Sequence, residues 1–187
     1  MNKKEIRKHH LKIRQEMSLT NVKDKSILIN DRILNLLSDY NLAKSIGLFY
    51  PYKNEVDVIL MALELEKRGL VCLLPKVINE HNPLKYFFYS PNSSNLEKGY
   101  GGIMEPTGNE TKDPDIIIAS CSAFNEKGYR VGYGGGFFDR TLSQLKHKKK
   151  IISILAAFEN QKTTYQFQDS HDEKVDYICT ENNTYQT

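Results

Sequence analysis

Short apolar runs that alternate with amphipathic segments constrain the fold of this chain more than any other feature of its sequence. The clearest run is Asp-Ile-Ile-Ile-Ala at residues 115–119, and a short, fully apolar strand is typical of the centre of a parallel sheet covered on both faces. Further strands are predicted at residues 45–50, 70–74, 84–89, 151–157 and 175–179. Helical spacing of apolar residues predicts helices at 3–17, 21–38, 57–68 and 136–147. This alternation predicts an α/β fold around a mainly parallel sheet.

The loops that follow three of these strands are the first candidates for a binding site. In open α/β sheets, ligands bind beyond the carboxyl ends of the strands. We therefore expect the site near the loops after Tyr50, Ala119 and Ala157. Residues 90–114 are rich in Gly, Pro, Ser and Asn, so they are predicted to form a long irregular segment. Loops of that length are usually functional or mobile.

Composition and charge exclude several classes of protein. A length of 187 residues suggests one domain, and 40% hydrophobic residues exclude long disorder. No apolar run approaches the roughly 20 residues of a membrane span. A net charge of +3 is too balanced for a dedicated nucleic-acid binder. The odd, widely spaced cysteines Cys72, Cys121 and Cys179 predict buried free thiols and a cytoplasmic protein.

The first predicted helix carries most of the positive charge. Residues 1–16 hold six basic and two acidic side chains. Lys4, Lys8 and Lys12 fall on one face, and Ile6, Ile13 and Met17 lie near another. Lysines at this spacing repel one another, and cations near a helix N-terminus oppose its dipole. The arrangement is either an ordinary solvated face or a site for an anionic partner, such as a nucleotide phosphate or RNA.

The most informative stretch is Arg-Val-Gly-Tyr-Gly-Gly-Gly-Phe-Phe-Asp-Arg at residues 130–140. Glycines let backbone N–H groups approach an anion, and the helix that follows adds about half a positive charge at its N-terminus. Arg130 and Arg140 flank the loop with forks suited to phosphate. Neither a Walker A ending nor GxGxxG is present. The spacing predicts a phosphate-binding loop, and the alternative is a tight strand-to-helix turn.

Two weaker signals accompany this loop. Residues 50–55, Tyr-Pro-Tyr-Lys-Asn-Glu, leave a predicted buried strand, and their tyrosines and glutamate suit a flat heterocycle. The alternative is a turn with a helix-starting acid, which is a common arrangement. A carboxylate among Asp169, Asp172 and Asp176 is a candidate to join Asp139 around Mg²⁺, with a polar loop as the alternative.

Taken together, these motifs resemble the 5-formyltetrahydrofolate cyclo-ligase family over nearly the whole chain. The resemblance rests on Lys-Lys-Glu-Ile-Arg at residues 3–7, Glu55, Leu74-Pro75, Glu105-Pro106, the stretch from Ala123 to Arg140, and the ending around His171-Asp172, Val175-Asp176 and Thr180-Glu181. Phe137 and Phe138 stand where the family has two tyrosines, Asn125 where it commonly has Asp, and Ser120 where a proline is common. The resemblance implies a Rossmann-like open, mainly parallel sheet with helices on both faces, in a single domain of residues 1–187.

The resemblance also implies a set of site residues. ATP binding is implied for Lys3, Lys4, Glu5, Ile6, Arg7, Arg130, Val131, Gly132, Tyr133, Gly134, Gly135, Gly136, Phe137 and Phe138. Contacts with the folate are implied for Tyr50, Glu55, Tyr133, Gly134, Gly135, Gly136 and Phe137. Mg²⁺ binding is implied for Asp139 and Asp172, and catalytic charge compensation for Lys4, Arg7 and Arg130.

The implied activity is the ATP- and Mg²⁺-dependent conversion of 5-formyltetrahydrofolate to 5,10-methenyltetrahydrofolate. ATP phosphorylates the formyl oxygen, and the folate's own N10 closes the ring, which gives ADP and phosphate. We expect a cytoplasmic monomer whose partners are ATP and a reduced folate, with no nucleic acid and no membrane. The alternatives are an ATP-dependent kinase or ligase for another small molecule, and an RNA-binding module that uses the basic first helix.

Overall fold

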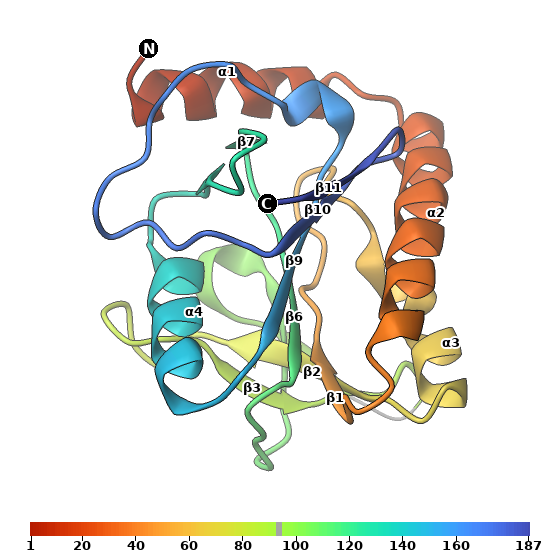
Figure 1. Cartoon of the computed structure of the whole chain (residues 1–187). Helices are drawn as coiled ribbons and strands as arrows, with labels where there is room; N and C mark the ends of the chain where they lie inside the picture. Colours follow the sequence, from red (N-terminus) through yellow and green to blue (C-terminus); the bar gives the residue numbers. More distant parts are fainter. Residues whose placement is uncertain (93–94) are drawn as a thin grey trace.

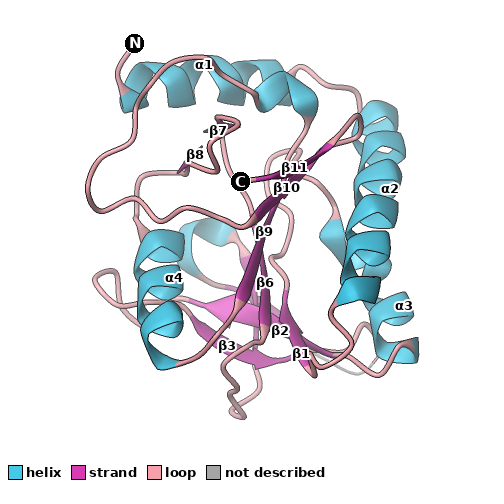
Figure 2. Cartoon of the chain, viewed as in Figure 1, coloured by secondary structure: helices cyan, strands magenta, loops and turns pink. Residues whose placement is uncertain are grey.

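The computed structural model describes residues 1–92 and 95–187, and its centre is a seven-stranded sheet (Figures 1 and 2). The strand order is β11-β10-β9-β6-β1-β2-β3. Neighbours from β10 to β2 run parallel, while β11 and β3 are antiparallel edge strands. The bounds are β1 Ser45–Gly47, β2 Val71–Lys76, β3 Lys85–Phe88, β6 Ile116–Ala119, β9 Ile152–Ala156, β10 Tyr177–Cys179 and β11 Thr184–Gln186.

Helices cover both faces of this sheet, as predicted. α2 (Leu19–Leu36) and α3 (Ala62–Lys67) lie on one side, and α4 (Phe137–Lys148) lies on the other (Figure 1). Ile116 and Ile118 belong to the core beneath α2, whereas Ile117 and Ala119 belong to the core beneath α4. A strand that is apolar at every position is therefore needed at the centre of the sheet, because both of its faces are buried.

α1 (Lys3–Gln15) does not cover a face but packs against segments that follow β6 and β9. Those segments are the hairpin of β7 (Ala123–Phe124) and β8 (Arg130–Val131), and the 3-10 helix Glu159–Gln161. Asn2 caps α1, because its side chain accepts the Glu5 N–H while the Glu5 carboxylate accepts the Asn2 N–H. α1 thus lies across the end of the sheet where parallel strands finish.

Two pairs of parallel strands are joined at their amino ends by the same arrangement of an aspartate and a serine. The Asp115 carboxylate accepts the backbone N–H and hydroxyl of Ser45 at 3.0 and 2.9 Å, and so links β6 to β1. The Asp176 carboxylate accepts the same two groups of Ser153 at 2.8 and 2.7 Å, and so links β10 to β9. Each aspartate anchors the start of one strand on its neighbour.

Several boundaries differ from those predicted. Residues 57–68 form a 3-10 helix, Val58–Met61, followed by the short α3 rather than one long helix. β2 continues through Pro75, because β1 pairs with β2 only as far as Leu73 and no β1 partner needs a proline N–H. The predicted irregular segment 90–114 contains a hairpin of β4 (Leu96–Lys98) and β5 (Met104–Pro106) around the 3-10 turn Tyr100–Gly102. Its residues 93–94 lie outside the described residues.

Other strands are shorter than predicted, and β7, β8 and β11 were missed because each has only two or three residues. The 3-10 helix Leu37–Asp39 extends α2. Within the described residues, no helix is both long enough and apolar enough to cross a membrane.

We expect Asp115→Asn to lower the free energy of unfolding at pH 7 by about 1–3 kcal/mol, because buried N–H groups lose a charged acceptor. Burial alone raises the pKa of the Asp115 carboxyl, but hydrogen bonds from Lys149, Lys44 and Ser45 outweigh it and hold the pKa at about 2, below the usual 3.8. The stabilisation is therefore present above pH 3.8 and is lost as the pH falls towards about 2. Urea unfolding from pH 7 down to pH ~2.5 measures this loss.

Asp113→Asn is the control, since exposed Asp113 makes a long 3.4 Å ion pair with Lys148. Equal effects of the two variants would contradict this account of the β1–β6 link.

Candidate active site

The sheet topology places the candidate site between β1 and β6. From β1 the chain proceeds to β2 on one side, and it later returns to β6 on the other side of β1, so the strand order reverses between these two strands. Ligands of open α/β sheets bind at the carboxyl ends of strands at such a reversal. The segment 49–55 follows β1, and Ser120 follows β6, in agreement with two of the three loops predicted.

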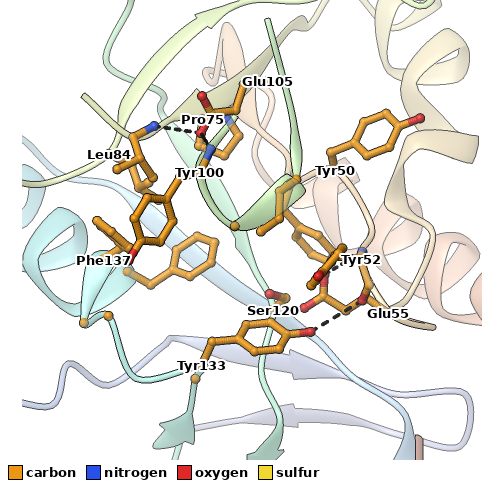
Figure 3. Close-up of a pocket in the computed structure, with 18 of the residues that line it drawn as sticks. Tyr50, Tyr52, Glu55, Pro75, Leu84, Tyr100, Glu105, Ser120, Tyr133 and Phe137 are labelled. Carbon is orange, nitrogen blue, oxygen red and sulfur yellow. Dashed lines mark hydrogen bonds between the residues drawn. The ribbon is translucent and has the colours of Figure 1, made fainter. Parts of the chain in front are cut away.

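A cavity of about 380 Å³ lies at this point (Figure 3). Its size falls in the range of small-molecule sites. It brings together most of the residues predicted to contact the folate, namely Tyr50, Glu55, Tyr133, Gly135, Gly136 and Phe137. Gly134 of the same predicted set does not line it. Arg130, Phe138 and Asp139 also line the cavity, so the glycine-rich loop forms one of its walls.

Glu55 is one of three acids that line this cavity, with Glu105 and Asp139, and its carboxylate is almost completely buried. Its Oε2 accepts the backbone N–H of Tyr52 at 3.0 Å, whereas its buried Oε1 accepts no hydrogen bond from any described residue. Burial raises the pKa of the Glu55 carboxyl, and the Arg14 guanidinium, the Tyr52 N–H and the hydroxyls of Ser120 and Tyr133 oppose that rise. A buried acceptor without a donor is costly, so Oε1 is suited to an N–H group of a ligand.

Arg14 of α1 is the partner of Glu55 that sequence reasoning missed. Its side chain is 1% exposed, and its Nη1 lies 3.8 Å from Glu55 Oε1. Nη1 also donates to the Cys121 carbonyl at 2.9 Å, Nε donates to the Lys53 carbonyl at 3.1 Å, and Nη2 donates to the Tyr133 hydroxyl. The buried face of α1 consists of Ile6, His10 and Arg14, rather than the predicted Ile6, Ile13 and Met17.

Aromatic rings form the remaining walls. Tyr52 and Tyr133 meet edge to face at 6.2 Å between ring centroids, and Tyr100 meets Phe137 in the same way at 5.3 Å. Figure 3 shows Tyr100 and Phe137 side by side, while the ring of Tyr50 points away from both Tyr133 and Phe137. Tyr52 and Tyr100 are therefore the better placed tyrosines for a flat ligand.

Glu105 supports the Tyr100 wall and was noted in the sequence without a role. It is 5% exposed, and its Oε1 accepts the N–H of Val77 at 3.1 Å and that of Tyr100 at 3.3 Å. A Cβ on Gly99 would lie 2.1 Å from this carboxylate, so only glycine fits there. In the sequence, three glycines around Tyr100 (residues 99, 101 and 102) were the signal that could have predicted an ordered turn here.

The glycine-rich loop has the geometry of an anion site. Gly134 and Gly136 have φ values of +108° and +66°, a region that residues with a Cβ rarely adopt. Gly136 is the N-cap of α4 and supplies no side-chain hydrogen bond to it, so N–H groups of the first turn remain free for a ligand. Arg7 donates from Nε to the Gly132 carbonyl at 2.6 Å, which ties α1 to the loop.

The predicted cations of α1 are not equivalent. Lys4 is exposed and has no hydrogen-bond or ion-pair partner among the described residues, whereas Lys3 bonds Asp169 and Asp172 at 2.7–2.8 Å. Burial lowers the pKa of the Lys3 ammonium, but these two carboxylates outweigh it and raise the pKa. Ile6 and Val131 belong to a small hydrophobic core, so their side chains do not reach a nucleotide. Glu5 is engaged in the helix cap.

The cations that flank the loop also differ. Arg130 is 4% exposed and donates to Asp139 Oδ1 and to the Glu173 carbonyl, both at 2.9 Å, and it lies over the Phe138 ring. Arg140 instead donates to the Glu80 carbonyl and lies over the Phe137 ring. Arg130 is thus fixed at the cavity, and Arg140 supports the aromatic wall.

The predicted metal ligands are both paired with cations. Asp139 accepts from Arg130, and Asp172 accepts from Lys3. Among the described residues no group of three or more His, Cys, Asp or Glu side chains is suited to a metal ion. Mg²⁺ is commonly bound through one or two carboxylates together with substrate phosphates, so the donors present fit a metal that arrives with a nucleotide.

The prediction of buried, free cysteines is confirmed for all three residues. Burial raises the pKa of the Cys121 thiol to about 12, so this cysteine next to the cavity is not a ready nucleophile.

Comparison with known proteins shows the family of this chain. A match to the 5-formyltetrahydrofolate cyclo-ligase family covers residues 1–181. The chain belongs to the 5-formyltetrahydrofolate cyclo-ligase family. The prediction of this family, of an ATP-dependent ligase and of the α/β fold is therefore confirmed.

Individual relatives of the cyclo-ligase family cover most of the chain. The 5-formyltetrahydrofolate cyclo-ligase of Haemophilus influenzae is 27% identical over 82% of this chain and 84% of that protein. The solved structure of Aquifex aeolicus 5,10-methenyltetrahydrofolate synthetase superposes with a TM-score of 0.81 at 30% identity, over 100% of this chain and 93% of that one. The synthetase of Mycoplasma pneumoniae gives a TM-score of 0.77 at 25% identity, over 97% and 99%.

We expect Gly135→Ala to weaken ligand binding in the cavity about tenfold, because its Cβ would lie 2.6 Å from the Phe137 ring and would push that ring from the wall. Calorimetric titration with 5-formyltetrahydrofolate as the probe measures the change. Gly108→Ala is the control, since nothing lies within 4 Å of a Cβ there. Unchanged affinity in Gly135→Ala would show that the Phe137 ring does not contact the ligand.

Proposed function

We propose that the cavity between the loops after β1 and β6 holds 5-formyltetrahydrofolate, and that the γ-phosphate of ATP faces it from the glycine-rich loop. The observation that carries this assignment is Glu55: a buried carboxylate oxygen without a hydrogen-bond donor faces an aromatic cavity beside a free helix N-terminus. The amino-pyrimidine edge of a pterin presents adjacent N–H groups, which suit such a carboxylate. The reaction is the conversion of 5-formyltetrahydrofolate to 5,10-methenyltetrahydrofolate, with ADP and phosphate as the other products.

The residues of the cavity determine the position of the folate. Glu55 Oε1 accepts N–H groups of the pterin, and Tyr52 and Tyr133 flank that ring system, while Tyr100 and Phe137 pack against the next ring of the substrate. The formyl group then lies near the glycine-rich loop. Holding the two reactants in this orientation removes much of the entropic barrier.

The chemistry requires an activated formyl group. The amide-like formyl oxygen attacks the γ-phosphorus, and the bond to ADP breaks. N10 then attacks the formyl carbon, the carbon–oxygen bond breaks with release of phosphate, and N10 loses its proton. The folate supplies its own nucleophile, which agrees with the absence of an activated cysteine at the cavity.

Cations of this chain compensate the charge on the transferred phosphoryl group. Lys4 is exposed and can approach the phosphates, and the terminal nitrogens of Arg7 bond none of the described residues while its Nε donates to the Gly132 carbonyl. Arg130 is held rigidly by Asp139 and Glu173, so little reorganisation accompanies its electrostatic contribution. Backbone N–H groups of residues 134–138 complete the cradle.

Mg²⁺ bound to ATP would neutralise part of the charge on the β- and γ-phosphates. Asp139 lines the cavity and is the carboxylate best placed to hold it. Asp172 is engaged by Lys3 and becomes available only when Lys3 turns to the nucleotide. Among the finer predictions, this metal assignment and the ATP contacts of α1 thus remain proposals.

We also propose that the chain acts as a monomer of one domain in the cytoplasm, without nucleic-acid or membrane partners. Its free, buried cysteines suit a reducing compartment.

The direct test is an absorbance assay with purified protein, Mg-ATP and 5-formyltetrahydrofolate. We expect growth of the near-ultraviolet band of the methenyl product, dependent on both ATP and Mg²⁺. ATP binding without any product would favour an ATP-dependent enzyme with another substrate. Neither product nor ATP binding, together with salt-sensitive RNA binding, would favour the RNA-binding alternative.

We expect Lys4→Ala to raise the KM for ATP about 10- to 100-fold, because one charged phosphate contact is lost. Lys8→Ala is the matched control, since Lys8 is one turn further along α1 and equally exposed. Steady-state kinetics at fixed, saturating folate separate the two variants. An unchanged ATP KM and kcat in Lys4→Ala would contradict the phosphate contact assigned to the first turn of α1.

A further inference from the structure

The environment of Glu55 raises the question of what keeps a buried acid ionised in an apolar cavity. An isolated buried carboxylate takes up a proton rather than remain charged. Glu55 can accept ligand N–H groups at Oε1 only while its carboxylate is ionised. A proton on Oε1 would turn that oxygen from an acceptor into a donor. Within the described residues, the positive group closest to Glu55 is the guanidinium of Arg14, itself 1% exposed.

We propose that Arg14 is a positioning residue for the cyclo-ligase reaction: it holds Glu55 ionised and fixes the Tyr133 hydroxyl beside it at the folate cavity. This inference rests on the proposed binding of folate by Glu55. Arg14 is not a catalytic residue, because it does not line the cavity. It acts through the two side chains that do.

The geometry of the guanidinium supports this assignment. All three of its nitrogens donate, and they reach three segments of the chain: the turn after β1 with Lys53 and the Glu55 carboxylate, Cys121 after β6, and Tyr133 of the glycine-rich loop. These are the segments on either side of the strand reversal. One planar group with a fixed fork therefore sets the distance between the acid and the ring that enclose the ligand.

The contacts with Glu55 are also asymmetric in a way that points to a ligand. Arg14 stands 3.8 Å from Oε1, close enough to stabilise its charge but too far for a hydrogen bond, and Oε1 has no other donor among the described residues. A buried acceptor without a donor is costly, so Oε1 is suited to an N–H group of a ligand. The gap leaves an oxygen that is charged and free to accept.

Arg14 also links the two halves of the reaction. Arg7 and Arg14 both belong to α1, and they hold consecutive residues of the loop, Gly132 by its carbonyl and Tyr133 by its hydroxyl. The helix that presents Lys4 to the nucleotide is thus the same helix that orders the folate acid. A shift of α1 moves both subsites together.

The charged and titratable groups that face Glu55 come from four segments. They are Arg14 of α1, Cys121 after β6, Tyr133 of the glycine-rich loop, and Tyr52 with Lys53 of its own turn. Burial raises the pKa of the Tyr133 hydroxyl and of the Cys121 thiol, so both stay neutral. The Lys53 ammonium lies over the Tyr52 ring. Removing Arg14 therefore removes the main charge that opposes protonation of Glu55.

The test is the pH profile of kcat/KM for 5-formyltetrahydrofolate in Arg14→Gln, between pH ~5.5 and ~8.5. Burial raises the pKa of Glu55 and Arg14 lowers it, so the variant protonates Glu55 at higher pH than the wild type does. We expect the acid limb to move to higher pH and the folate KM at pH 7 to rise about 10- to 100-fold. Arg14→Lys keeps the charge, so its acid limb returns towards that of the wild type. Lys12→Gln, on the exposed face of α1, is the matched control.

If Arg14→Gln folds poorly, a double-mutant cycle still tests the proposal. It compares the thermal unfolding midpoints of the wild type, the two single variants and the double variant. Glu55→Gln and Arg14→Gln each leave one buried charge alone, whereas the double variant leaves none. We expect the double variant to unfold at a higher temperature than Arg14→Gln. Additive losses in this cycle, or a folded Arg14→Gln whose acid limb coincides with the wild type, would overturn the proposal. A wild-type protein that forms no methenyl product would instead count against the proposed function itself.

Discussion

The burial of two opposite charges, Arg14 and Glu55, is the constraint on which the candidate active site depends. A guanidinium and a carboxylate cannot be buried without partners for their remaining donors and acceptors. Arg14 meets this requirement with carbonyl groups from the segments after β1 and β6. The position of α1 across the end of the sheet is thereby fixed, and so are the loops that α1 touches. Replacing the pair with apolar side chains would preserve packing but would remove the acid from the cavity.

The charged side chains of the site are of two kinds, buried and rigidly held or exposed. Arg130, Glu55 and Glu105 are buried and held by backbone or side-chain partners, so they define the shape of the cavity. Lys4 is exposed and has no partner among the residues that the structure describes, and Lys3 is held by Asp169 and Asp172. Phosphoryl transfer depends on positioning and charge compensation more than on covalent catalysis by the protein. A preorganised cavity beside an exposed lysine suits a reaction in which the substrate provides its own nucleophile.

Much of the fold could be predicted from the sequence, because its signals are local. The run at residues 115–119 marked the central strand, and the glycines of residues 132–136 marked the loop before α4. The hairpin of β4 and β5 was missed, since strands of three residues carry no clear alternation. β2 was predicted to end at Leu74, two residues before its actual end at Lys76, because proline stops a strand only where a neighbour needs its N–H.

The residues that form the site were harder to predict from the sequence than the fold was. Glu55 and the glycine-rich loop have recognisable patterns, but Arg14 is one of six basic residues in a basic helix. Its burial depends on which face of α1 meets the loops after β6 and β9, which is a long-range property. The spacing of Ile6, His10 and Arg14 was the available signal, and the polar character of two of these residues concealed it.

The measurement that tests the account most directly follows the formyl oxygen. 5-Formyltetrahydrofolate labelled with ¹⁸O in its formyl group is converted with Mg-ATP, and the released inorganic phosphate is analysed by mass spectrometry. The account predicts that each phosphate carries one labelled oxygen, because the formyl oxygen attacks the γ-phosphorus in a cavity that places the two together. Unlabelled phosphate alongside methenyl product would contradict it, because the formyl oxygen would then have left by another route.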